Sequence, residues 1–133
     1  MRKREILKNL KKKFEVDVKY FNEYDFEVIT DSKSYFVKVL NITENHQITI
    51  NSKLIWNIKK GKIHGIKFNT VSSVFLNLRE FNKLENKIIV LTNKPHKLLR
   101  VLNESDLEDV SEEKVINDVF IAYSIDELIE HIK

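Results

Sequence analysis

The stretch EVDVKYFNEYDFEVITDSKSYFVKVLN, residues 15–41, decides the fold of this chain. Polar and apolar residues alternate in three parts of it, and β-branched and aromatic side chains fill most of the apolar positions. A period of two with such side chains is typical of β-strands. The pattern predicts strands over residues 15–21, 24–30 and 34–41. Because the polar breaks between these segments are short, we expect an antiparallel meander.

Helical patterns lie on both sides of the meander. Residues 2–14 predict an amphipathic helix, because apolar residues recur there every three to four positions. The same spacing over 70–86 predicts a second helix, with Val71, Val74, Phe75, Leu78 and Phe81 on one face. At the end of the sequence, Ser124 and Glu127 form a capping-box pattern that predicts a third helix.

The remaining segments predict further strands and leave one region open. The apolar run at 87–92 indicates a strand covered on both faces, and 97–102 and 119–123 are expected to be strands as well. Ser105 and Glu108 fit the cap of a brief helix. Residues 53–60 fit a short helix capped by Ser52, which we favour, or a hairpin made by 53–58 and 62–68.

The order of these elements predicts an α/β (α+β) fold. We expect a single mixed β-sheet with helices on both faces, in which an αβββαβ core is followed by a C-terminal β-β-α extension. Because no linker, repeat or low-complexity segment divides the sequence, residues 1–133 are expected to form a single domain.

Two glycines and the lack of cysteine exclude several kinds of chemistry. Gly61 and Gly65 cannot supply the glycine-rich loops that bind dinucleotides or phosphates. Without cysteine there are no disulfides, thiolate zinc sites or thiol nucleophiles. No segment approaches the ~20 apolar residues of a membrane span, and residues 1–14 lack the pattern of a signal peptide. We therefore expect a cytoplasmic protein without membrane contact, and the Lys-, Asn- and Ile-rich composition indicates an AT-rich genome.

The net charge of +3 conceals a strong segregation of charge along the chain. Four consecutive blocks alternate in sign: +6 for residues 1–14, −4 for 15–52, +9 for 53–100 and −8 for 101–133. Such blocks predict a positive face that binds DNA or RNA and an acidic region that meets a basic protein partner. Alternatively, the blocks fold against each other and neutralise.

The predicted register of the meander places three charged residues on one sheet face. With a two-residue turn at Ser32-Lys33, Glu27 is opposite Lys38, and Asp25 lies on the same face. Paired carboxylates can hold a divalent cation that activates water, and a nearby lysine can stabilise charge on a phosphate. The alternative is a solvated Glu27–Lys38 pair without chemical function.

With these residues in these elements, the chain resembles the PD-(D/E)XK nuclease superfamily. Asp25 matches the Asp of the second strand, and Lys38 matches the lysine of the Glu/Asp-X-Lys motif on the third strand. Phe36 occupies the position of the motif acid. The resemblance allows this acid to lie on the second helix instead, where Glu80 is the candidate. The resemblance implies a site made of Asp25, Glu27, Lys38 and Glu80, with Asp25 as the metal ligand and Mg²⁺ as the cofactor if the enzyme is active.

One basic–aromatic cluster supplies candidate contacts to nucleic acid. Trp56 can stack on a base and the nearby lysines can contact phosphates, although tryptophan at such a position is more often part of the core. The cluster consists of Lys53, Trp56, Lys59, Lys60, Lys62 and Lys67. The leading hypothesis is a catalytically degenerate nuclease-fold protein, or pseudo-nuclease, that binds nucleic acid or a protein partner. The alternatives are an active Mg²⁺-dependent nuclease and a non-enzymatic interaction or regulatory module.

Overall fold

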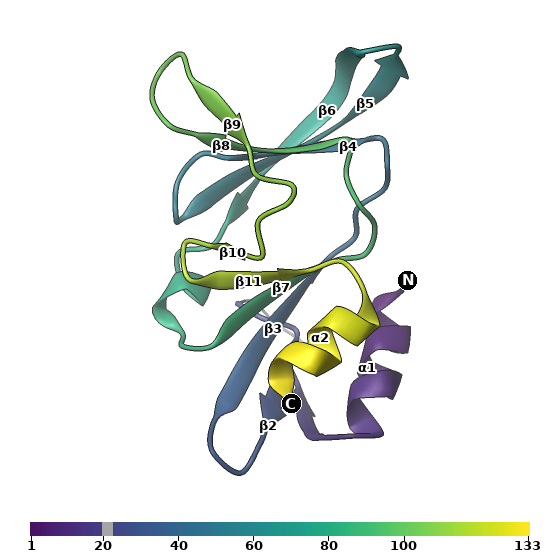
Figure 1. Cartoon of the computed structure of the whole chain (residues 1–133), viewed down its shortest axis with the longest axis vertical. Coiled ribbons are helices and arrows are strands. Elements are labelled where there is room, and N and C mark those ends of the chain that lie inside the picture. Colours follow the sequence, from purple (N-terminus) through teal and green to yellow (C-terminus); the bar gives the residue numbers. More distant parts are fainter. Residues whose placement is uncertain (20–22) are drawn as a thin grey trace.

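The computed structural model describes residues 1–19 and 23–133, which form two α-helices and two mixed β-sheets (Figure 1). Sheet A contains β1 (Glu15–Val18), β2 (Phe26–Ile29), β3 (Ser34–Leu40), β7 (Lys87–Leu91), β11 (Val119–Ala122) and β10 (Val115–Ile116), in that spatial order. Sheet B contains β6 (Lys67–Asn77), β5 (Ile55–His64), β4 (His46–Ile50), β8 (Lys97–Val101) and β9 (Leu107–Asp109), also in spatial order.

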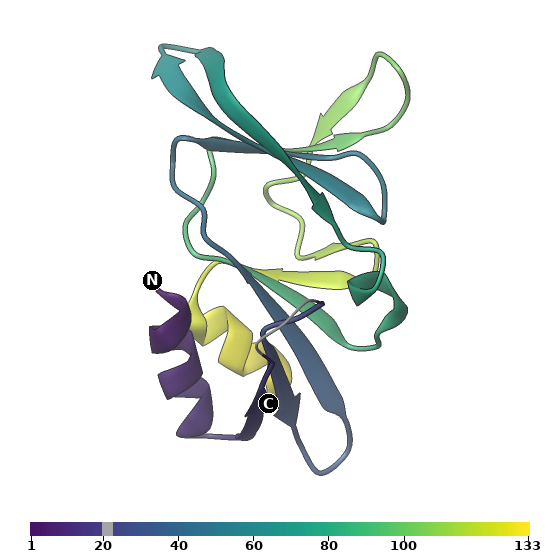
Figure 2. The same cartoon turned by 180° about the vertical axis from the view of Figure 1, so that it is seen from behind.

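Both helices lie on one face of sheet A, and sheet B lies on the other face (Figures 1 and 2). Helix α1 (Lys3–Lys11) and helix α2 (Ile125–Ile132) pack with Ile88 and Val90 of β7. The alternate residues of β7, Ile89 and Leu91, pack with sheet B. The central strand is thus covered on both faces, as its apolar sequence predicted.

The expected mixed α+β class is confirmed, but the single sheet with helices on both faces is wrong. The face of sheet A that was expected to carry the second helix is covered by sheet B instead. The chain passes from sheet A to sheet B twice, from β3 into β4 and later from β7 into β8. Thr92 links these two connections. Its Oγ1 accepts a hydrogen bond from the Ile42 N–H (2.8 Å) and donates one to the Ile42 carbonyl (3.1 Å).

Three predicted helices are absent from the described residues, because local hydrogen bonding favours strands there. Residues 53–60 form no helix and instead belong to a hairpin, which was the alternative interpretation. Ser52 Oγ accepts hydrogen bonds from the backbone N–H groups of Leu54 and Ile55 and so closes a turn. Residues 70–77 belong to β6, whose Val, Thr and Ser residues are poor helix formers, and only Phe81–Lys83 form a 3-10 turn, η1. Ser105 lies in the turn between β8 and β9.

The other predicted elements are confirmed with small changes at their ends. Ser124 caps α2 by accepting a hydrogen bond from the Glu127 N–H at 3.1 Å. The strand expected over 15–21 is described only for Glu15–Val18, and the part of this prediction at residues 20–22 lies outside the described residues. In the described part of the chain, neither helix combines the length and the apolar character needed to cross a membrane.

The register of the meander differs by two residues from the predicted one. The turn contains residues 30–33, since the Thr30 side chain and the Lys33 backbone exchange hydrogen bonds of 2.8 and 3.2 Å. Glu27 therefore pairs with Phe36 rather than with Lys38. A shift by an even number preserves the faces, so Glu27, Phe36 and Lys38 still share one side of the sheet.

Candidate functional site

Asp25 lies just before β2, where its carboxylate connects two other elements. Oδ2 accepts a hydrogen bond from the Val39 backbone N–H at 2.7 Å. Oδ1 accepts one from Nζ of Lys3 in α1 at 3.0 Å. Both carboxylate oxygens therefore have partners, and Asp25 fastens helix α1 to the end of β3.

Lys38 lies close to Asp25, as the resemblance implies. Burial lowers the pKa of Lys38, the negative charge of Asp25 opposes that shift, and the ammonium of Lys3 adds to it. Lys38 Nζ also lies 3.5 Å from the carbonyl oxygen of Glu23. The structure thus brings Asp25 and Lys38 together and adds Lys3, which the strand pattern alone could not place there.

The two other predicted acids have different surroundings. Glu27 lies opposite Phe36, and the Phe36 ring packs edge-on against Tyr24 with centroids 5.0 Å apart. Glu80 lies at the start of η1, where its exposed carboxylate pairs with Lys83 at 3.1 Å. Among the described residues, no three His, Asp or Glu side chains form a group that can hold a metal ion. The Asp25 cluster, as arranged, is one carboxylate between two ammonium groups.

The second candidate surface is the basic hairpin, which we define as residues 53–79 and which contains β5 and β6. It carries six Lys or Arg residues and no Asp or Glu. Five of the six are exposed and Lys59 is half-buried. None of them forms an ion pair with a carboxylate in the described part of the chain. The hairpin projects away from the helices, so its positive charge faces solvent (Figure 1).

Trp56 does not belong to the exposed part of this hairpin. Only 2% of its surface is accessible, because it packs in the core between the two sheets with Ile48 and Leu98. Stacking of Trp56 on a base, which the sequence allowed, is therefore wrong, and the alternative as a core residue is confirmed. Phe75, which pairs with Asn57 on the neighbouring strand, is 70% exposed instead. The sequence missed Phe75 because the helical spacing placed it on a buried face.

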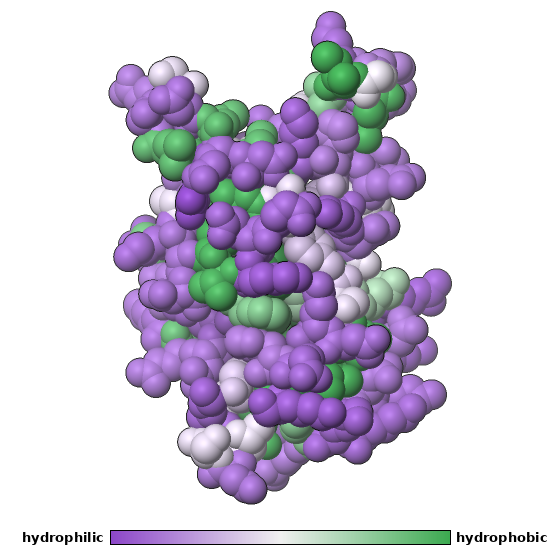
Figure 3. All heavy atoms as spheres, in the orientation of Figure 1, coloured by the Kyte–Doolittle hydropathy of each residue, from purple (hydrophilic) through white to green (hydrophobic). Residues whose placement is uncertain are grey.

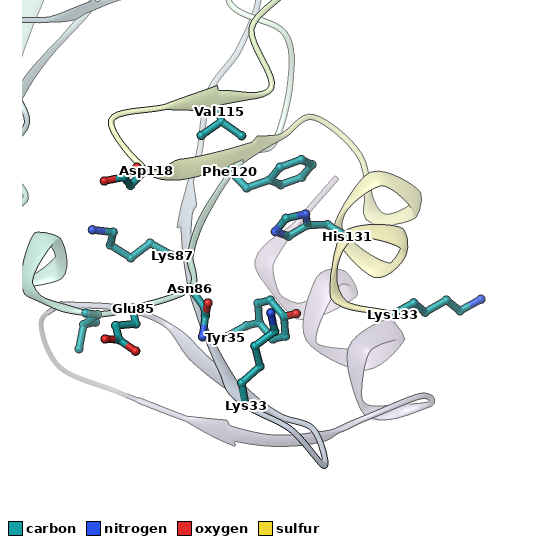
Figure 4. A pocket seen from close by; sticks show the side chains of 11 residues that line it. Lys33, Tyr35, Glu85, Asn86, Lys87, Val115, Asp118, Phe120, His131 and Lys133 are labelled. Atoms are coloured by element: carbon teal, nitrogen blue, oxygen red, sulfur yellow. The ribbon is translucent and has the colours of Figure 1, made fainter.

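Figure 4 shows a hollow of about 680 Å³ at the beginning of β7 and β11 that the sequence did not predict. One wall is His131 stacked on Phe120, with ring centroids 3.8 Å apart and an angle of 4°. Burial lowers the pKa of His131, and the charge of Lys33 lowers it further. Buried Lys87 donates to the Asn82 carbonyl at 3.0 Å. Because lysines and carboxylates both line the hollow, its charge selects no single class of ligand.

Comparisons with known proteins add no evidence about the site. No family model matches the chain, and neither a curated protein nor a solved structure matches it.

Proposed function

We propose that this chain is a non-catalytic binding protein that contacts nucleic acid through the basic hairpin. The observation that carries the proposal is the composition of residues 53–79, where six basic side chains project without one acidic residue among them. Lysine and arginine contacts to phosphates release counterions and supply most of the affinity of proteins that bind without sequence preference.

The shape of the hairpin favours single-stranded nucleic acid. Lys59 of β5 and Phe75 of β6 lie on one face of the hairpin, because Asn57 pairs with Phe75 and Lys59 pairs with Ser73. An exposed aromatic ring beside basic side chains is the combination that stacks one base while neighbouring phosphates are neutralised. Phe75 thus takes the role that the sequence gave to Trp56.

The arrangement around Asp25 supports a function without cleavage. The carboxylate is shared by Lys3 and the Val39 N–H, and the motif position on β3 holds Phe36. The order α1-β1-β2-β3 followed by a parallel β7 beside β3 agrees with the resemblance to PD-(D/E)XK nucleases. We infer a nuclease-like framework whose catalytic residues now stabilise the fold.

A salt titration tests the proposal. We expect a fluorescent single-stranded DNA to bind with an affinity that falls steeply as the salt concentration rises. In the triple variant Lys59→Ala/Lys60→Ala/Lys62→Ala, the slope of log binding constant against log salt concentration should become shallower by about 2. The matched control, Lys8→Ala/Lys11→Ala/Lys12→Ala in and after α1, removes the same charge from the other basic block. Equal weakening by both triple variants would show that only net charge matters.

A second experiment separates the binding protein from an active nuclease. Incubation of single- and double-stranded DNA with the protein and Mg²⁺ or Mn²⁺ is expected to leave the DNA intact, and the same ions are expected to leave the melting temperature unchanged. DNA cleavage that disappears in both Asp25→Asn and Lys38→Met would establish the enzyme instead.

A further inference from the structure

The two edges of sheet B differ in length and charge. The edge strand β6 has 11 residues, and the segment from Phe68 to Leu78 contains no charged side chain. Val74 and Phe75 in this segment are 61% and 70% exposed. Edge strands of soluble proteins are normally shortened or carry charges that prevent another strand from pairing with them. Strand β6 is long and most of it is uncharged, so it has neither of these protections, although a bulge at Val71 interrupts it.

The opposite edge carries the complementary charge. We define the acidic arm as residues 101–113, which include β9 and contain six acidic residues and no basic one. Arg100 pairs with Glu108 at 2.7 Å and Lys94 pairs with Glu112 at 3.4 Å, which leaves the turn around Glu104 without such a neutralising partner among the described residues. Leu102 and Leu107 of this arm are each 57% exposed.

The basic hairpin and the acidic arm form two separate projections at the same end of the molecule (Figure 1). In the space-filling view, each projection carries hydrophobic surface beside hydrophilic surface (Figure 3). Each edge of sheet B therefore offers exposed apolar side chains and unpaired backbone groups, together with charge opposite to that of the other edge.

We propose that copies of this chain associate head to tail, with β6 of one copy lying against the acidic arm of the next. The six basic residues of the hairpin then face the six acidic residues of the arm, and Val74 and Phe75 are covered together with Leu102 and Leu107. This inference goes beyond nucleic-acid binding and does not depend on it.

Charge distinguishes this arrangement from a two-fold dimer in which two β6 strands pair. Antiparallel pairing about the middle of β6 would bring Lys67 of one copy near Arg79 of the other, and it would place two entirely basic hairpins side by side. Like charges at such positions oppose association. A head-to-tail contact is heterologous, so it joins further copies unless the rotation closes a ring.

A mixing experiment with two variants tests the proposal. Val74→Glu places a negative charge on the β6 edge, and Leu107→Lys places a positive charge on the acidic arm, so each variant sets like charges against each other at the contact. Both residues are more than half exposed, so both variants should fold. In sedimentation at low salt, we expect the mass of the wild type to rise with concentration to at least twice that of one chain. Each variant alone should remain a monomer, whereas their equal mixture should associate, because the unchanged acidic arm of one variant meets the unchanged β6 of the other.

Three results would overturn the proposal. A wild type that stays monomeric at every concentration would show that the edges do not associate. Association that persists in Leu107→Lys would indicate the two-fold β6 pairing, which does not use the acidic arm. Association that strengthens with salt would contradict attraction between the basic hairpin and the acidic arm.

The same variants keep this inference separate from the proposed function. Leu107→Lys should bind single-stranded DNA at least as tightly as the wild type, because it leaves the basic hairpin intact and frees it from the contact with the acidic arm. Loss of assembly with retained DNA binding would support both proposals, and absence of DNA binding even by monomeric Leu107→Lys would remove only the proposed function.

Discussion

Sheet A and the basic hairpin of sheet B reach opposite degrees of burial. In sheet A, β7 is buried along its whole length because helices cover one face and sheet B covers the other. In the hairpin, most of β6 is exposed on both faces, and burial ends near Trp56 and Leu78. Burial between layers therefore stabilises sheet A and the base of the hairpin near Trp56, while the exposed part of the hairpin is free to carry a binding surface.

The largest expected effect compares two aromatic residues of the same hairpin. Trp56→Ala should lower the free energy of unfolding by about 3–5 kcal/mol, because it removes a buried ring between the two sheets. Phe75→Ala should change it by no more than about 0.5 kcal/mol, since Phe75 is largely exposed. Urea denaturation of both variants measures the difference. Similar losses would mean that the hairpin is buried in solution.

The next prediction concerns Asp25, which fastens α1 to sheet A. Asp25→Ala leaves the half-buried Val39 N–H without its partner and should cost about 1–3 kcal/mol of unfolding free energy. Asp31→Ala, at an exposed position of the next turn, is the matched control. A gain of stability in Asp25→Ala would contradict the structural role, because carboxylates kept for catalysis are often held at the expense of stability.

A more local effect is expected near the tip of the hairpin. At Gly61 a Cβ atom would clash with the Asn69 carbonyl oxygen and lie 2.8 Å from the Phe68 ring. Gly61→Ala should therefore disturb the pairing of β5 with β6 at a cost of about 1–3 kcal/mol. Hydrogen exchange of the hairpin amides should accelerate while that of β7 stays unchanged. Gly65→Ala is the comparison variant: its Cβ meets nothing within 4 Å, but the φ of +64° makes alanine strained there.

The smallest effect is a pH dependence at the junction of β11 and α2. Burial acts to raise the pKa of Glu127, but hydrogen bonds from the Tyr123 N–H (2.6 Å) and Lys114 (3.1 Å) outweigh it, so the pKa lies below its ordinary 4.5. The stabilisation is present above pH 4.5 and is lost as the pH falls through the lowered pKa.

Comparison of variants at two pH values isolates this contribution. Glu127→Gln should be less stable than the wild type at pH 6, and the difference should shrink at pH 3. Glu130→Gln, exposed on the same helix, should follow the wild type throughout. An equal difference at both pH values would show that packing, rather than charge, makes Glu127 important.

Most elements of sheet A could be predicted because they have unambiguous local signals, whereas the two-residue strand β10 (Val115–Ile116) was not predicted. The alternation over 24–30 and 34–41, the apolar run of β7 and the Ser124 cap each correspond to one structure only. The local signals in segment 70–81 conflict. Its apolar residues fit a helical face, while its Val, Thr and Ser residues favour a strand, and the partner strand β5 decided between them.

The candidate sites show the same limit. The sequence correctly placed Asp25 and Lys38 on one side of the sheet, because an error of two residues in register does not change the face. It could not place Lys3 beside them, since that contact depends on how α1 packs. The acidic arm and the basic hairpin were visible as charge blocks, but their positions on opposite edges of one sheet were not.

Neighbouring residues were enough to predict the meander, the doubly covered strand, the N- and C-terminal helices and the segregated charges. Tertiary packing settled that a second sheet, rather than a helix, covers sheet A. It also decided that Trp56 is buried while Phe75 is exposed. Both outcomes depend on pairing and packing between segments far apart in the chain, and the energies of those contacts exceed the weak local preferences that the sequence reveals.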